Sequence, residues 1–192
     1  MSFPVFDILA SRADLGPERS AFEDMTSGEN VSYPELHQRT GRTTALLSSL
    51  DISHGNCIAL LCRNRIEFFE LLFACARLGA ILVPLNWRMP AKELAPLLDD
   101  CNATLLIHGA EDAETANSLA GGKTLLLDLD GVGDIGFGKR RDDRQAMAGR
   151  DSSLADETWY LLYTSGTTGK PKAVIQTYGM ALANYINIAQ AM

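Results

Sequence analysis

Residues 164–173 hold the densest group of side chains that could bind phosphate: four hydroxyls, two glycines and two lysines in ten residues. Glycines let backbone N–H groups approach a ligand closely, hydroxyls donate to phosphoryl oxygens or join a magnesium shell, and lysines neutralise charge. Together these groups predict a cradle for a polyphosphate. A flexible surface turn of similar composition is the alternative, but the buried strand predicted at 159–163 leads directly into the loop, as in functional loops on rigid scaffolds.

The loop differs from the common P-loop. Only two residues separate Gly166 from Gly169, and Pro171 follows Lys170 where the P-loop needs Ser or Thr. The β-branched Val174 and Ile175 then predict a strand after the loop, whereas a P-loop leads into a helix whose N-terminus faces the phosphates. The sequence therefore predicts a phosphate loop between two strands.

Apolar segments alternate with amphipathic ones along most of the chain, which is typical of an α/β fold with βα units on a largely parallel sheet. Strands are predicted at 57–62, 80–85, 104–108, 124–127, 159–163 and 173–175. Helices are predicted at 66–76, from Pro90 to about residue 100, and at 112–119. Gly79 stands where a helix would end in a left-handed conformation.

The N-terminal region predicts a hairpin of strands at 20–24 and 31–33 around a turn at 27–30. Ser32, Pro34 and Glu35 then form the pattern of a capped helix start, because Ser accepts from the first turn and Glu three residues later completes a capping box. The helix is expected to bury Leu36, Thr43, Leu46, Leu47 and Leu50.

Residues 131–153 interrupt the βα pattern with glycines and mixed charges. They predict a mobile surface loop without a helix or strand, rather than a basic binding patch, because aspartates lie among the basic residues at 139–144. Residues 131–136 match G-x-G-x-x-G, but no amphipathic helix is predicted after them, so a dinucleotide site there is disfavoured.

Composition limits the function classes. The chain has 192 residues with 46% hydrophobic and 21% charged content, enough for one sizeable core in one domain or part of a larger one. Its net charge of −7 argues against nucleic acid or an anionic membrane as a partner held by a general basic surface. The longest apolar runs are much shorter than the ~20 residues that a membrane-spanning helix needs.

The cysteines and histidines indicate neither disulfides nor a metal site. The chain has four cysteines with no C-x-x-C pair and no secretion signal at its start, which favours free thiols in the reducing cytoplasm. The histidines lack the spacing of metal ligands, so no protein metal site is predicted. The residues concerned are Cys57, Cys62, Cys75, Cys101, His37, His54 and His108.

Residues 163–173 resemble the phosphate-binding signature of the adenylate-forming superfamily, which includes acyl-CoA synthetases, luciferases and peptide-synthetase adenylation domains. Residues 31–36 resemble the family's early "TYxEL" helix start, residues 55–60 its "GDxVAI" strand, and residues 77–86 its "GAxxVPLN" segment. On this resemblance, residues 1–192 form the N-terminal part of the large AMP-binding domain.

Residues 84–88 are similar to the acyl-CoA synthetase branch, because amino-acid-activating domains usually carry Asp where Asn86 stands. An amino-acid adenylation domain and a non-catalytic nucleotide-binding module remain the alternatives. The chain departs from the family at Ala173, which is commonly Gly, and at Tyr178, where many members have His. The methyl group of Ala173 should be tolerated, and Tyr178 is expected to affect the mouth of the acid pocket.

The resemblance implies a carboxylate–CoA ligase that uses ATP, Mg²⁺ and coenzyme A to activate a carboxylic acid, fatty or aryl, through an acyl-adenylate. Lys172 is expected to act in catalysis by neutralising charge on the departing pyrophosphate. A homo-oligomer is compatible with the sequence. The residues expected to wrap the β- and γ-phosphates are Thr164, Ser165, Gly166, Thr167, Thr168, Gly169, Lys170 and Lys172.

The last residues form a helical pattern without an end signal, in which Tyr178, Leu182, Tyr185, Ile186 and Ala189 recur at helical spacing. We therefore expect a truncated domain. It would lack the adenine- and ribose-binding motifs, most of the acid pocket and the small C-terminal domain with its catalytic lysine that the resemblance implies. Alone, it should not complete catalysis.

Overall fold

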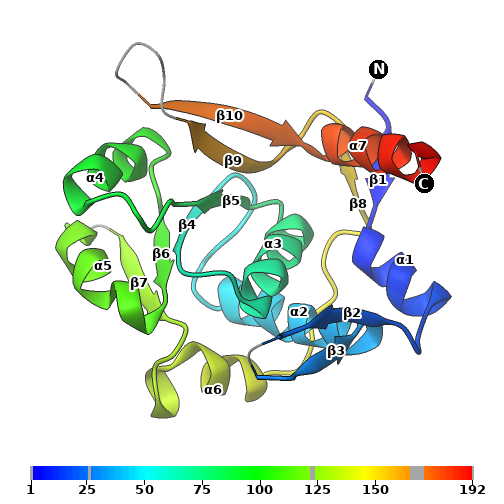
Figure 1. Cartoon of the computed structure of the whole chain (residues 1–192), viewed down its shortest axis with the longest axis horizontal. Coiled ribbons are helices and arrows are strands. Elements are labelled where there is room, and N and C mark those ends of the chain that lie inside the picture. Colours follow the sequence, from blue (N-terminus) through cyan, green and yellow to red (C-terminus); the bar gives the residue numbers. More distant parts are fainter. Residues whose placement is uncertain (1, 26, 122–123, 165–170, 192) are drawn as a thin grey trace.

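The computed structural model describes residues 2–25, 27–121, 124–164 and 171–191. A six-stranded sheet crosses the molecule in the order β10-β9-β5-β4-β6-β7 (Figure 1). Strand β10 is antiparallel to β9, and the four other neighbouring pairs are parallel. This confirms the predicted α/β fold with a largely parallel sheet. The strands are β4 (Cys57–Leu61), β5 (Ile81–Pro84), β6 (Leu105–His108), β7 (Leu125–Asp128), β9 (Thr158–Thr164) and β10 (Lys172–Thr177).

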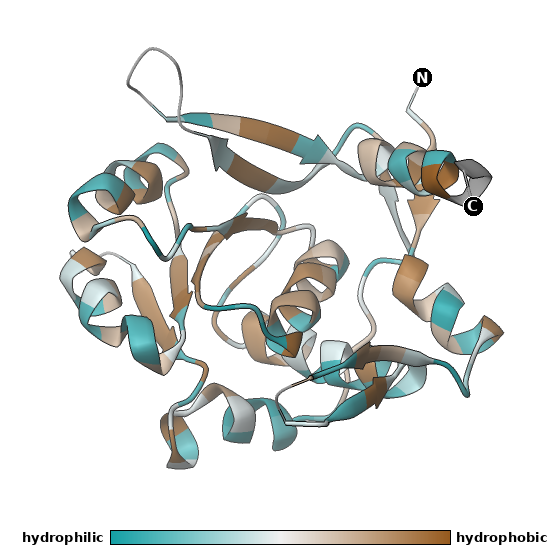
Figure 2. Cartoon of the chain, viewed as in Figure 1, coloured by the Kyte–Doolittle hydropathy of each residue, from teal (hydrophilic) through white to brown (hydrophobic). Residues whose placement is uncertain are grey.

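Helices cover both faces of this sheet. On one face α2 (Tyr33–Ser48) and α3 (Ile66–Leu78) pack against a cluster that includes Ile58 and Leu60, and on the other α4 (Ala91–Asp100) and α5 (Ala113–Leu119) cover Ala59 and Leu61. Successive side chains of a strand point to opposite faces, so β4 supplies both clusters and all five of its residues are buried. Figure 2 shows these central strands as hydrophobic ribbons enclosed by helices with mixed outer faces.

Gly79 ends α3 as predicted. Its φ is +73°, in the left-handed region that favours glycine. A Cβ at this position would also lie 2.6 Å from Cδ2 of His54, so the site demands glycine for two separate reasons.

The predicted N-terminal hairpin and capped helix are also present. Strands β2 (Ser20–Glu23) and β3 (Asn30–Ser32) pair antiparallel. The Ser32 hydroxyl accepts a hydrogen bond from the backbone N–H of Glu35 at 3.3 Å, which begins α2. Of the expected apolar stripe, Leu36, Thr43, Leu46 and Leu47 are buried and Leu50 is partly buried.

The expectation of a loop without regular structure at 131–153 is wrong. This stretch contains the 3-10 turn η2 (Gly133–Ile135), α6 (Phe137–Asp142) and β8 (Ser152–Leu154). The N-terminal β1 (Pro4–Phe6) pairs antiparallel with β8 and leads into α1 (Ile8–Leu15). A short 3-10 turn, η1 (Ala110–Asp112), precedes α5. The mobility of the stretch stays a prediction.

Helix α6 is anchored by a buried aromatic ring and a buried ion pair, which explains why no apolar stripe marks it in the sequence. Phe137 is 1% exposed within the core. The Arg141 Nη1 atom lies 3.0 Å from Oε2 of Glu70, a buried residue of α3 that also pairs with Arg39 of α2 at 2.8 Å. Burial raises the pKa of Glu70 above its usual range, against the opposing effect of Arg141 and Arg39.

The glycines at 131–136 allow two backbone segments to touch. A Cβ on Gly136 would lie 1.6 Å from the carbonyl oxygen of Gly131. The helix that follows has only six residues, so the segment lacks the long helix of a dinucleotide site. The match to G-x-G-x-x-G is therefore explained by close packing.

Helix α7 (Tyr178–Ala191) follows β10 directly, as the helical pattern predicts. Tyr178 is buried, whereas Tyr185 is 60% and Ile186 45% exposed. Leu182 is partly buried, so two of the four stripe residues with described side chains are exposed. Within the described residues, no helix is both long and apolar enough to span a bilayer.

Candidate functional site

The hairpin of β9 and β10 positions the predicted phosphate loop. Thr164 ends β9, Lys172 begins β10, and the two residues face each other as partners in the antiparallel ladder. The six predicted site residues between them, Ser165, Gly166, Thr167, Thr168, Gly169 and Lys170, lie outside the described residues. Thr164 and Lys172 are both exposed. The structure thus brings the two ends of the predicted cradle together in solvent.

Strand β9 is held from both faces of the sheet. The indole N–H of Trp159 donates to the carbonyl oxygen of Leu72 in α3 at 2.9 Å. On the other face, the Tyr163 hydroxyl donates to Oδ2 of Asp100 at the end of α4 at 2.6 Å. Burial and this carboxylate raise the pKa of Tyr163 above its usual range. One residue before Thr164, the strand is therefore fixed to α4.

Thr164 lies at the carboxyl edge of the parallel strands, where open α/β sheets bind their ligands. Residues 86–88 follow β5 and Arg63 follows β4 at the same edge. The guanidinium of Arg63 lies 3.4 Å from the ring centroid of Trp87, and that of Arg88 lies 4.0 Å away. Cation–π contacts of this kind hold the two positive charges beside the indole.

The two arginines differ in whether an acidic side chain lies close enough to neutralise their charge. Arg63 lies 3.5 Å from Oδ1 of Asp112, which is 7% exposed. Within the described residues, Arg88 and Lys172 have no ion pair. The sequence predicted Lys172 but gave Arg88 no role and did not single out Arg63. A signal was present for both, since each arginine comes within four residues of the carboxyl end of a core strand.

Ala173 lies opposite Tyr163 in the ladder and is exposed. Its methyl group therefore meets solvent rather than a neighbouring backbone. This agrees with the expectation that the strand tolerates alanine where the family commonly has glycine.

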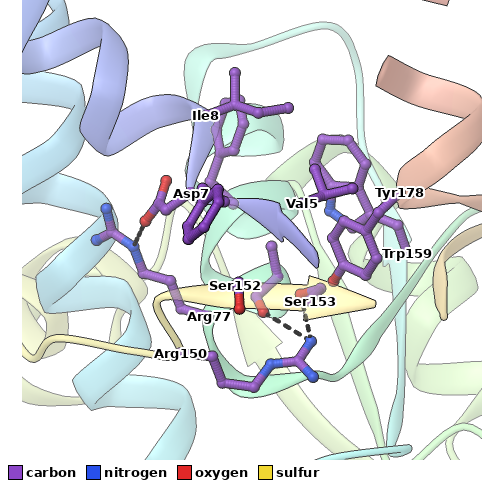
Figure 3. A pocket seen from close by; sticks show the side chains of 12 residues that line it. Val5, Asp7, Ile8, Arg77, Arg150, Ser152, Ser153, Trp159 and Tyr178 are labelled. Carbon is purple, nitrogen blue, oxygen red and sulfur yellow. Dashed lines mark hydrogen bonds and ion pairs between the residues drawn. The ribbon is translucent and has the colours of Figure 1, made fainter. Parts of the chain in front are cut away.

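Tyr178 occupies the packed base of the hairpin. Its ring stacks on Trp159 with centroids 5.2 Å apart and planes 13° from parallel, and it is 4% exposed. Figure 3 shows both rings at a pocket that Val5 and Arg150 also line. Its cavity volume of about 30 Å³ suits a water molecule rather than an organic acid. Tyr178 is thus a packing residue here, and its effect on the acid pocket stays a prediction.

The charges around this pocket are paired. The Arg150 guanidinium donates to Oγ of Ser153 at 2.8 Å and to Oε2 of Glu157 at 2.5 Å. The Nε atom of Arg77 donates to Oδ2 of Asp7 at 2.9 Å. The pocket therefore lacks the unpaired cations found at the carboxyl edge of the sheet.

Comparison with known proteins decides the family. The model of the family described as AMP-binding enzyme matches residues 9–192. The chain belongs to the AMP-binding enzyme family. Phosphate binding by the loop of the hairpin stays a prediction.

The relatives of this AMP-binding chain include CoA ligases. It is 34% identical to a feruloyl-CoA synthase of Amycolatopsis sp over 92% of this chain and 34% of the relative. It is 29% identical to the long-chain-fatty-acid–CoA ligase FadD13 of Mycobacterium tuberculosis over 89% of this chain and 34% of that one. The chain spans about a third of the length of these relatives.

A solved relative shows the same fold. The o-succinylbenzoate CoA synthetase MenE of Bacillus subtilis, in complex with its acyl-adenylate intermediate, superposes with a TM-score of 0.84 at 27% identity, covering 99% of this chain and 47% of that one. The same enzyme in complex with ATP and magnesium gives 0.78 at 26% identity, covering 98% and 48%. The chain thus has the fold of an N-terminal region of this superfamily.

Proposed function

We propose that the complete gene product is an ATP-dependent acid–CoA ligase and that residues 163–173 form its polyphosphate loop. The observation that carries the proposal is the closed hairpin end, where exposed Thr164 and Lys172 face each other at the carboxyl edge of the sheet. The names of the relatives, all CoA synthases or ligases, support the same reaction class.

In the proposed reaction, a carboxylate oxygen attacks the α-phosphorus of ATP and the bond to the bridging oxygen breaks, releasing pyrophosphate. The thiol of coenzyme A then attacks the acyl carbon, its proton is lost, and AMP leaves as the thioester forms. Lys172 would neutralise the negative charge that grows on the pyrophosphate during the first step. The rigid attachment of β9 through Tyr163 and Trp159 would keep the loop in place without reorganisation.

The side chains that the structure describes suit a magnesium ion whose ligands come mainly from the bound nucleotide. Among the described residues, no cluster of three or more acidic, histidine or cysteine side chains could hold a metal ion. Mg²⁺ at nucleotide sites commonly takes most of its ligands from phosphates and water, with few from protein. The Thr164 hydroxyl at the strand end could complete such a shell, and the ion when bound would share the neutralisation of phosphate charge.

We further propose a fatty or aryl carboxylic acid as substrate, on the names of the feruloyl and long-chain-fatty-acid relatives. We also propose a cytoplasmic location, where the four free cysteines would stay reduced.

Carboxylate-dependent exchange between ATP and pyrophosphate tests the proposal. The complete gene product would be assayed with magnesium and a panel of fatty, aryl and amino acids. We expect exchange with a fatty or aryl acid, and thioester formation once coenzyme A is added. Folded protein that binds ATP but supports no exchange would favour a non-catalytic module, and exchange with amino acids alone would favour an amino-acid adenylation domain.

A further inference from the structure

The segment that joins β1 to α1 is fastened to two other helices through Arg77 of α3. The Asp7 carboxylate accepts a hydrogen bond from Nε of Arg77 at 2.9 Å (Figure 3), and its other oxygen accepts one from the backbone N–H of Ala10 at 3.0 Å. The same guanidinium reaches α2, where its Nη2 atom lies 2.8 Å from Nδ1 of His37. Arg77 is 5% exposed, so this one buried cation links the start of α1 to α2 and α3.

The contact with Arg77 determines the protonation state of His37. A guanidinium has only N–H donors and stays charged in proteins, so Nδ1 of His37 must be the acceptor and carry no proton. A proton on that nitrogen would set two positively charged donors against each other, and the hydrogen bond would be lost. Burial and the Arg77 charge lower the pKa of His37, against the opposing effect of Asp7 and Asp14.

Solvent can reach His37 without unfolding of α2. The side chain is partly exposed, and it lines a cavity of about 430 Å³ between α1, α2 and residues 146–151. Arg150 is already paired with Glu157, so it adds little free positive charge beside the ring. The charged residues around the cavity come from the start and middle of α1, from α3 and from the segment before β8: Asp7, Asp14, Arg77, Arg150 and Asp151.

We propose that His37, Arg77 and Asp7 form a pH-sensitive latch, which holds β1 and α1 in place while His37 is neutral and loosens them when it takes up a proton. The step adds one proton from solvent to Nδ1 and breaks the hydrogen bond from Arg77. Val5, two residues before Asp7, belongs to the cluster of Trp159 and Tyr178 at the base of the β9–β10 hairpin, so loosening would extend to that base. The inference is independent of the proposed ligase reaction, because it rests on contacts that the reaction does not use.

The neutral folded form of His37 decides the sign of the pH effect. A histidine in the loosened segment has an ordinary pKa of about 6.5, so it takes up a proton that the closed segment excludes. The closed form is therefore fully stable above that pH and loses stability as the pH falls below it. His54 offers a contrast, because its Nε2 atom lies 3.8 Å from Oε2 of Glu157 and protonation there would gain an acidic partner.

Amide exchange at several pH values tests the latch in the complete gene product. Protection factors, which correct for the intrinsic effect of pH on exchange, would be compared between residues 4–15 and β4. We expect protection at residues 4–15 to fall roughly four- to eightfold between pH 7 and pH 5.5, as uptake of one proton on opening allows. Protection in β4 should not follow this fall.

Two variants make the assignment specific. In His37→Asn the side-chain oxygen can accept from Arg77 in place of Nδ1 but cannot be protonated, so protection at residues 4–15 should no longer change with pH. His54→Asn removes an exposed histidine outside the latch and should keep the fall. A fall that persists in His37→Asn would overturn the proposal. Protection in the parent that is equal at the two pH values, or that falls equally in β4, would overturn it whether or not the variants fold.

Discussion

Strands β4 and β10 belong to the same sheet but lie in opposite environments. All five residues of β4 are buried between helices on both faces. Strand β10 also has apolar residues at its centre, yet Val174 is 40% and Ile175 52% exposed. The difference shows that an apolar run predicts a strand but does not fix its burial. In this molecule the central strands form the buried core, and the outer hairpin carries the loop that we propose binds phosphate.

The largest effect should come from shortening a buried side chain of β4. Leu60→Ala removes a residue that is 1% exposed, and such truncations cost about 2–5 kcal/mol in free energy of unfolding. The matched change Ile175→Ala on β10 should cost well under half as much, because much of its side chain already meets water. Urea unfolding of both variants measures the difference, and equal costs would show that β10 is as well packed as β4.

The next effect should come from Gly79→Ala at the end of α3. The left-handed backbone and the contact with His54 both oppose a methyl group, so we expect a loss of roughly 1–3 kcal/mol. Gly55→Ala provides the control, because its φ is also positive but nothing lies within 4 Å of the added Cβ. A smaller loss at Gly55 than at Gly79 would separate the steric cost from the backbone cost, and equal losses would show that the backbone cost alone decides.

A smaller effect should follow from Tyr163→Phe, which removes the hydrogen bond to Asp100 and keeps the ring. The loss should be about 0.5–1.5 kcal/mol in stability, the usual range for a single hydrogen bond. Amide exchange should accelerate at residues 160–164 more than in β4. Faster exchange spread evenly over the sheet would contradict the view that Tyr163 anchors only the hairpin.

The smallest effect should come from Asp130→Asn, which breaks the paired hydrogen bonds from Arg65 at 2.9 Å. The Arg65 guanidinium holds the pKa of Asp130 below its usual range, so the ionised carboxylate stabilises the folded state above the ordinary pKa of about 3.9. That stabilisation disappears as pH falls through the lowered folded-state pKa. The variant should be less stable by under ~1 kcal/mol at pH 7, because the pair is partly exposed, and equal to the parent in strong acid.

Unfolding measured from pH 7 down to strong acid would check this. A difference between parent and variant that persists or grows below the lowered pKa would contradict the electrostatic explanation and indicate a loss of packing instead.

The sequence predicted the elements whose signals are local. The apolar run of β4, the glycine that ends α3 and the Ser32 cap each depend on a few neighbouring residues, and all three are confirmed. The pairing of β1 with β8 was missed because it joins residues far apart in sequence through short segments with no shared pattern. Helix α6 was missed because its anchors are one ring and an ion pair to Glu70.

At the candidate site, too, features with a local sequence signal were predicted and features that join distant residues were not. Thr164 and Lys172 were predicted as site residues from a contiguous motif, and the structure adds that the two face each other in an antiparallel ladder. The contact of Tyr163 with Asp100 and the stacking of Arg63 on Trp87 could not be predicted, because they depend on which strands and helices become neighbours in the fold. The roles of the residues between Thr164 and Lys172 stay predictions.

The central claim, that the β9–β10 hairpin holds the polyphosphate, is tested most directly by the rate of ATP–pyrophosphate exchange in Lys172→Ala and Lys92→Ala variants of the complete gene product. Both lysines are exposed, but Lys92 lies on α4 and begins no strand of the hairpin. We expect the exchange rate to fall about 100-fold in Lys172→Ala, the usual loss for one preorganised charge-stabilising group, and to stay unchanged in Lys92→Ala. An unchanged rate in Lys172→Ala, with exchange intact in the parent, would contradict the account.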